Sequence, residues 1–317
     1  MGIDGRRPRP PAPASVSEQA REYLSTPSPF GEQHLPELDD VAGWQRYVEE
    51  RDAYLIARLG AHPLPVVSSE IEVAGVRTYV VHAEGVDDGR TTPIYLDIHG
   101  GALVMGGGEG CRLMASAGAM TSGMLHWAPD YRMPPLHPYP AALDDCLAVY
   151  RALLAQRAPE EIVVGGGSAG GNLAAALLLR AKDEGLPMPA ALALLSPEVD
   201  LTESGDSFHT ALGVDHVLGL LMPVNLLYAA GHDLTDPYLS PLFGDLGGFP
   251  PTYLQTGTRD LFLSNTVRMH RALRAAGVEA ELHVGEAMPH GGLGGAPEDI
   301  DLAMELRRFL DSHRRRA

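Results

Sequence analysis

Residues 165–172 read GGGSAGGN, between the apolar run Ile162–Val164 and a helical pattern that continues through Arg180. This stretch contains the pattern Gly-x-Ser-x-Gly, with Ser168 at its centre. A nucleophilic serine on a sharp strand-to-helix turn requires small neighbours, because the backbone is strained there and larger side chains would block the substrate. Such a turn also directs the N–H of Ala169 and the positive end of the helix at a reacting carbonyl oxygen. We therefore predict that Ser168 is a nucleophile and Ala169 an oxyanion-hole donor.

The same glycines also fit a different class of protein. Gly165, Gly167 and Gly170 have the spacing of a dinucleotide-binding loop, in which glycines at the start of a helix cradle phosphate. Taken alone, this stretch therefore leaves a nucleotide-binding protein open as an alternative.

A second glycine-rich stretch favours the nucleophile. LDIHGGALVMGGG, residues 96–108, overlaps the end of a predicted strand at Pro93–Ile98 and continues as its loop. Acyl transfer requires backbone N–H groups close to the developing oxyanion, and glycine allows that close approach. We therefore predict Gly100 and Gly101 as further donors and a structural hydrogen-bonding role for His99. Most isolated HGG strings are ordinary turns, but this one precedes a Gly-x-Ser-x-Gly turn.

A serine hydroxyl also needs a base, and the base needs an acid that fixes its tautomer. MPHGG places His290 in a glycine-bounded loop after the predicted strand Glu279–Val284, and LQTGTRD places Asp260 after another strand. Glu198 and Asp200 follow the preceding strand and are the rival acids. Glu198 is alternatively a residue that orients the hydrolytic water, and Asp200 one that supports the site from behind.

Apolar strands alternate with amphipathic helices along the chain, which predicts an α/β fold with a mostly parallel sheet and helices on both faces. The first two strands, Glu70–Val73 and Arg77–Ala83, are joined too tightly to be parallel, so one edge of the sheet should be antiparallel.

Three segments are expected. Residues 1–16 are rich in Pro and Arg and predict a flexible tail, and residues 17–60 predict N-terminal cap helices. Residues 61–317 form the catalytic domain. Residues 202–239, with a helix around Val214–Ala230, interrupt it as a second cap segment, because they are too long for a simple crossover.

Composition excludes several classes of protein. The 317 residues include 24 Lys+Arg and 41 Asp+Glu, so the formal net charge of −17 disfavours nucleic acids and stable membrane association. The two cysteines and the histidine spacing match no metal site, so no metal or organic cofactor is expected. No apolar run is long enough to span a bilayer and no signal peptide is evident, which predicts a cytoplasmic protein.

HGGA, GGSAGG, TGTRD and MPHGG occur in this order, and together they resemble the α/β-hydrolase fold and its hormone-sensitive-lipase-like family of bacterial carboxylesterases. The resemblance covers about residues 65–312. It implies a catalytic triad of Ser168, Asp260 and His290. It also implies a helical cap over the site, and the oxyanion donors already predicted.

The resemblance extends to APDYRMPPLHPYPAALDD, where it suggests that Asp130 and Arg132 brace the oxyanion loop. The sequence departs from the family at several positions. The third glycine of the usual HGGG is Ala102, and Gly167 precedes the nucleophile where the main subgroups carry Asp or Thr. Glu198, Gly285 and Gly292 stand where aromatic residues are common. The two glycines near the base suggest a roomier acyl or alcohol pocket.

The expected function is a serine carboxylic ester hydrolase that acts on short- to medium-chain esters through an acyl-enzyme intermediate. The same triad also suits a lactone or an amide or carbamate hydrolase, because pocket shape decides the substrate. An alternative of another class is a non-catalytic small-molecule receptor. The strand Glu279–Val284 lies at a predicted sheet edge, where a homodimer is possible.

Overall fold

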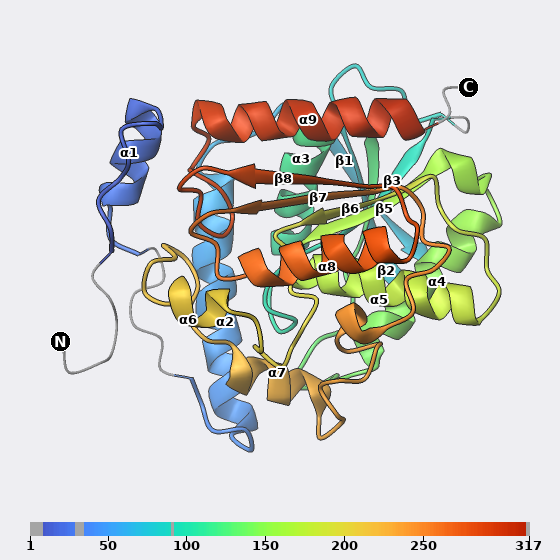
Figure 1. The fold of residues 1–317 in the computed structure, drawn as a ribbon. Coiled ribbons are helices and arrows are strands. Elements are labelled where there is room, and N and C mark those ends of the chain that lie inside the picture. Colours follow the sequence, from blue (N-terminus) through green and yellow to red (C-terminus); the bar gives the residue numbers. More distant parts are fainter. Residues whose placement is uncertain (1–8, 29–34, 90–91, 315–317) are drawn as a thin grey trace.

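The computed structural model describes residues 9–28, 35–89 and 92–314. In these residues a single sheet of eight strands has the order β1-β2-β4-β3-β5-β6-β7-β8 (Figure 1). The strands are β1 (Val66–Val73), β2 (Val76–Ala83), β3 (Ile94–Ile98), β4 (Leu125–Pro129), β5 (Ile162–Gly167), β6 (Ala191–Leu195), β7 (Thr252–Gly257) and β8 (Ala280–Gly285).

The sheet is parallel from β4 through β8, whereas β1 and β2 pair antiparallel with each other and β2 pairs antiparallel with β4. This confirms the predicted mostly parallel sheet with an antiparallel edge. The tight Ala74–Gly75 turn leaves β2 no room for a crossover, so it must run back along β1.

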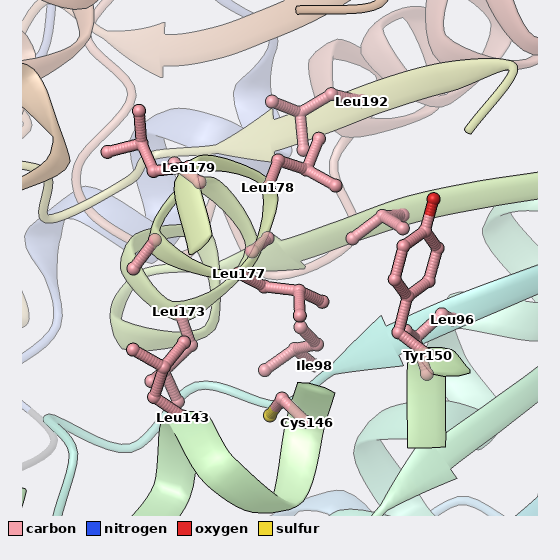
Figure 2. Packing of buried hydrophobic residues seen from close by; sticks show 14 of the residues in the cluster. Leu96, Ile98, Leu143, Cys146, Tyr150, Leu173, Leu177, Leu178, Leu179 and Leu192 are labelled. Atoms are coloured by element: carbon pink, nitrogen blue, oxygen red, sulfur yellow. The ribbon is translucent and has the colours of Figure 1, made fainter. Parts of the chain in front are cut away.

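Different helices cover the two faces of the sheet. In β3, Leu96 and Ile98 pack with α4, α5 and α8, whereas Tyr95 points to the opposite face and packs with α9. Figure 2 shows Leu143 of α4 beside Leu173 of α5 in the larger core. The covering helices are α3 (Glu109–Ser122), α4 (Ala141–Leu154), α5 (Ala169–Asp183), α8 (Leu263–Ala275) and α9 (Pro297–His313).

The pattern of apolar residues in the sequence does not indicate helix α3. Its buried face is built from small residues, including Cys111, Ala115 and Ala119, rather than from large apolar side chains. These pack against Tyr79 and Val81 of β2, so the bulk at this contact comes from the sheet. Periodicity of large apolar residues therefore misses the helix.

The cap segment is less helical than expected. Instead of one helix around Val214–Ala230 it contains α6 (Ser207–Thr210) and α7 (Met222–Ala229). Between them, Gly213 has a φ of +76°, and the Asp215 carboxylate accepts bonds from backbone N–H groups two and three residues ahead. Both features form a turn and prevent a continuous helix.

The N-terminal region supplies α1 (Glu18–Ser25) and α2 (Val41–Gly60), both within the range predicted for cap helices. The flexible tail expected for residues 1–16 is not observed in residues 9–16. Val16 is buried against Met288 and Leu293, and Arg259 donates a hydrogen bond to the Pro11 carbonyl. Anchoring to the catalytic domain thus overrides the Pro-rich composition, while residues 1–8 lie outside the described residues. No described helix combines the length and apolarity needed to cross a membrane.

Candidate active site

Ser168 lies on the turn between β5 and α5, with a φ of 57° and a ψ of −123°. This backbone conformation is rare for a residue with a side chain, and it persists only where the surroundings impose it. The surroundings here are close: a Cβ on Gly170 would collide with the carbonyl oxygen of Ile98. The glycine pattern therefore brings the end of β3 against the first turn of α5, and a half-buried Ser168 is left at the surface of that contact.

The loop after β3 lies directly beside the serine. A Cβ on Gly100 would be 3.4 Å from Ser168 Cβ and 2.9 Å from the Gly167 carbonyl oxygen. Gly101 has a φ of +129°, and a side chain there would collide with the Met105 carbonyl. Ala169 is the first residue of α5, where a backbone N–H has no partner within the helix. The structure thus places Gly100 beside Ser168, and the predicted donor Ala169 directly follows Ser168 at the start of α5.

Two carboxylates hold the glycine-rich loop. Asp130 accepts a hydrogen bond of 2.8 Å from the Gly108 N–H and another from Arg77. Asp52, on the cap helix α2, accepts one of 2.7 Å from the Gly106 N–H. Asp130 therefore braces the loop as the family resemblance suggests, while Asp52 is a second brace that sequence reasoning missed.

His99 and Arg132 have different surroundings. His99 Nδ1 is 2.7 Å from the Gly100 carbonyl oxygen, and its ring stacks on Tyr131 at 4.0 Å. These contacts are those of a structural residue in the loop. The Arg132 guanidinium instead donates to the Asp145 carboxylate of α4. The Arg132 backbone N–H donates to the same carboxylate, so in the described residues Arg132 binds α4 and the expected brace of the oxyanion loop is not present.

The acid and base predicted from sequence contact each other. Asp260 follows β7, is fully buried and has its Oδ1 3.2 Å from His290 Nδ1. Burial opposes ionisation of Asp260, but the His290 imidazole and hydrogen bonds such as that from the Phe262 N–H hold its pKa below the ordinary value. The Thr256 hydroxyl donates to its other oxygen.

Burial lowers the pKa of His290, but the carboxylates of Asp260, Asp215 and Glu198 outweigh it and leave that pKa raised. The imidazole therefore faces three acidic groups. This surrounding stabilises the protonated form that a general base adopts after it removes a proton.

Glu198 and Asp200, the rival acids, are placed differently. The Glu198 N–H donates to the Ser168 carbonyl oxygen at 3.2 Å, and burial raises the pKa of its carboxyl to about 8. Asp200 is also buried, and its carboxylate binds other side chains. Its carboxylate accepts bonds from Thr202, Ser204 and Arg268, and these bonds hold its pKa below the ordinary value although burial opposes ionisation.

Asp215 is the second residue that sequence reasoning missed. It belongs to the cap, and its Oδ2 accepts a hydrogen bond of 2.7 Å from the N–H of Leu261, next to Asp260. Burial and the neighbouring Asp260 charge raise its pKa. A signal was present in the sequence, because Asp215 is the only acidic residue in the apolar stretch ALGVDHVLGLL.

An apolar cluster joins both cap segments to the catalytic loops. Phe262 meets the His290 ring edge-on at 5.0 Å. The cluster unites cap residues, the oxyanion loop and the segment after the acid, and its buried members are Trp44, Val104, Phe208, Ala211, Leu221, Val224, Leu261 and Phe262. Among the described residues, no group of three or more His, Cys, Asp or Glu could hold a metal ion.

Other side chains lie directly beside the two glycines near the base. A Cβ on Gly285 would lie 3.0 Å from the Met288 sulfur, and one on Gly292 would lie 2.6 Å from Asp299 Oδ1. Met288 and Asp299 thus occupy the positions that a Cβ on Gly285 or Gly292 would approach.

A second Ser–His–Asp chain shows what distinguishes Ser168. Ser122 Oγ is 2.6 Å from His126 Nε2, and His126 Nδ1 is 2.9 Å from Asp97 Oδ2. Ser122 is buried at the end of α3, where the negative end of the helix dipole disfavours an oxyanion. Ser168 stands at the start of α5, where the dipole favours one. Residue types alone do not make a nucleophile site.

The strained turn at Ser168, the Gly100 loop beside it and the buried Asp260–His290 pair are features that suit acyl transfer. A family model for the α/β-hydrolase fold matches residues 95–293. An esterase of Acinetobacter venetianus is 34% identical over 66% of this chain and 69% of its own length. An acetyl-hydrolase of Streptomyces hygroscopicus is 35% identical over 60% of this chain and 64% of its own length.

Solved structures extend the similarity to nearly the whole chain. A crystal structure of an esterase superposes with a TM-score of 0.90 at 38% identity, covering 98% of each chain. An esterase of the bacterial hormone-sensitive lipase family superposes with a TM-score of 0.79 at 32% identity, covering 89% of this chain and 99% of its own. The chain belongs to the α/β-hydrolase family, in its hormone-sensitive-lipase-like branch of bacterial carboxylesterases.

Proposed function

We propose that this protein hydrolyses carboxylic esters with short to medium acyl chains through an acyl-enzyme intermediate on Ser168. The observation that carries the proposal is the position of Ser168, on a strained turn between the Gly100 loop and the first N–H of α5. Such an arrangement stabilises charge on a carbonyl oxygen.

In the proposed reaction, Ser168 Oγ attacks the ester carbonyl carbon while His290 takes the hydroxyl proton. The N–H groups of Gly100, Gly101 and Ala169 hold the oxyanion, and donors of this kind are each worth roughly 3 kcal/mol in measured cases. His290 then protonates the leaving alcohol. Water, deprotonated by the same imidazole, attacks the acyl-enzyme and releases the acid, and the proton returns to Ser168. Asp260 keeps the imidazole in the required tautomer throughout.

The substrate class is inferred from the surroundings of the site. The apolar cluster of cap and loop residues favours an uncharged acyl or alcohol group. The relatives named esterase and acetyl-hydrolase agree with this class.

The proposal is tested with nitrophenyl esters from acetate to laurate and one unactivated lactone. The wild type should turn over the short esters, and Ser168→Ala should lose about a millionfold in kcat, as nucleophile removal does in a comparable triad. Ser122→Ala is a matched control, because it also removes a serine hydroxyl from a Ser–His–Asp chain, and it should keep its kcat. Equal activity of Ser168→Ala and wild type would refute the mechanism. A lactone rate above every ester rate would reassign the substrate.

A further inference from the structure

Asp215 of the cap is a buried carboxylate, 5% exposed, that binds two separate segments of backbone. Its Oδ1 accepts hydrogen bonds from the N–H groups of Val217 at 2.8 Å and Leu218 at 3.2 Å, within its own turn. Its Oδ2 accepts the 2.7 Å bond from Leu261, the residue that follows Asp260. One side chain thus ties the cap turn to the loop that carries the catalytic acid.

The charges around Asp215 explain why a carboxylate here affects the reaction. Asp260 and His290 face it from the acid loop and the histidine loop, and Glu198 faces His290 as well. On the outer side, Arg9 and Arg58 face the adjacent His216. A buried carboxylate next to another carboxylate is unfavourable unless a cation or N–H donors compensate. At Asp215 the N–H donors of the cap turn and of Leu261 compensate at all times. The compensating cation is the His290 imidazolium, which forms only during acyl transfer.

The N-terminal helix holds this arrangement from outside. The rings of Tyr23 and His216 lie 4.9 Å apart, and Thr26 and Arg9 also reach the His216 ring nitrogens. Tyr23 additionally contacts the histidine loop, where a Cβ on Gly294 would lie 2.7 Å from Tyr23 Cδ2. The position of Asp215 relative to His290 is therefore fixed by α1 as well as by Leu261.

We propose that Asp215 is a positioning residue of the active site, which fixes the backbone beside Asp260 and holds a second negative charge toward the His290 imidazolium. The proposal rests on the triad mechanism above. In this proposal the cap stabilises the protonated form of the base His290, in addition to covering the substrate.

The test compares Asp215→Asn with Asp299→Asn. Asp299 is a matched control, because it also accepts backbone N–H bonds, from Leu293 at 2.9 Å and Gly295 at 2.7 Å, in the histidine loop. Loss of the Asp215 charge removes one cause that raises the pKa of His290. The acid limb of kcat/KM should therefore move about one pH unit lower. The kcat should fall about tenfold while KM stays unchanged. Asp299→Asn should leave the acid limb in place.

An unmoved acid limb in Asp215→Asn, or an equal shift in Asp299→Asn, would overturn the proposal. If the asparagine variant does not fold, Asp215→Ser is used, since its hydroxyl can still accept a bond in the turn. NMR titration of the His290 imidazole in a Ser168→Ala background gives a reading without turnover. In that background the Asp215 substitution should still lower the pKa of His290. The result therefore tests this proposal separately from ester hydrolysis.

Discussion

The Asp52 carboxylate accepts a 2.7 Å hydrogen bond from the backbone N–H of Gly106, and this bond joins the cap helix α2 to the oxyanion loop. Asp52 is about half-buried, and burial raises its pKa while the Gly106 bond lowers it. The loop that presents Gly100 to Ser168 is thus held from the cap and, through Asp130, from the catalytic domain.

Removal of this bond should weaken the oxyanion hole. Asp52→Ala is expected to lower kcat about tenfold on short esters, because the loop no longer holds the donor N–H groups at one position. Steady-state kinetics with nitrophenyl acetate measures the effect. Glu49→Ala, at an exposed acidic residue on the same helix, is the control and should match the wild type. Equal losses in both variants would point to general damage to α2.

The identity of the catalytic acid can be tested by two isosteric substitutions. Asp260→Asn should reduce kcat about 10⁴-fold, because an amide 3.2 Å from His290 Nδ1 favours the wrong tautomer. Glu198→Gln should reduce kcat far less, since Glu198 binds the serine turn through its backbone N–H. Single-turnover kinetics of both purified variants decides between them. A larger loss in Glu198→Gln would transfer the role of acid to Glu198.

Glu198 should also make stability depend on pH. Its pKa is about 8 in the folded protein and near 4.5 when the chain is unfolded. Below pH 4.5 both states are protonated. As the pH rises from 4.5 to 8 only the unfolded state releases the proton, so the free energy of unfolding falls.

Urea unfolding of wild type and Glu198→Gln at several pH values tests this effect. The stability of the glutamine variant relative to wild type should increase between pH 5 and pH 8, on the order of a few kcal/mol. A difference that stays constant over this range would show that Glu198 is already ionised in the folded protein.

Asp130 and Arg132 should respond differently to substitution by alanine. Asp130→Ala releases the Gly108 N–H and Arg77 and should lower kcat about tenfold through the oxyanion loop. Arg132→Ala removes a half-exposed ion pair with Asp145, so it should cost at most about 1 kcal/mol of stability and leave kcat unchanged. Thermal unfolding and ester kinetics of both variants separate the two effects. A loss of kcat in Arg132→Ala would instead show that Arg132 braces the oxyanion loop, as the family resemblance suggests.

Several features of this protein could be predicted from sequence because their causes are local. The Gly-x-Ser-x-Gly turn requires small residues within a few positions of Ser168, and Asp260 and His290 each lie in a loop that follows a short strand. The antiparallel β1–β2 edge follows from the short turn at Gly75. Each of these can be read without knowing what packs against it.

Other features depend on which distant segments meet, and only the tertiary structure decided them. Asp52 and Asp215 bond to backbone N–H groups 54 and 46 residues away, so no spacing rule indicates them. Arg132 binds Asp145 rather than the loop, and Met288 and Asp299 fill the spaces beside Gly285 and Gly292. The physical reason is that hydrogen-bond satisfaction and close packing are settled between elements, after local patterns have formed them.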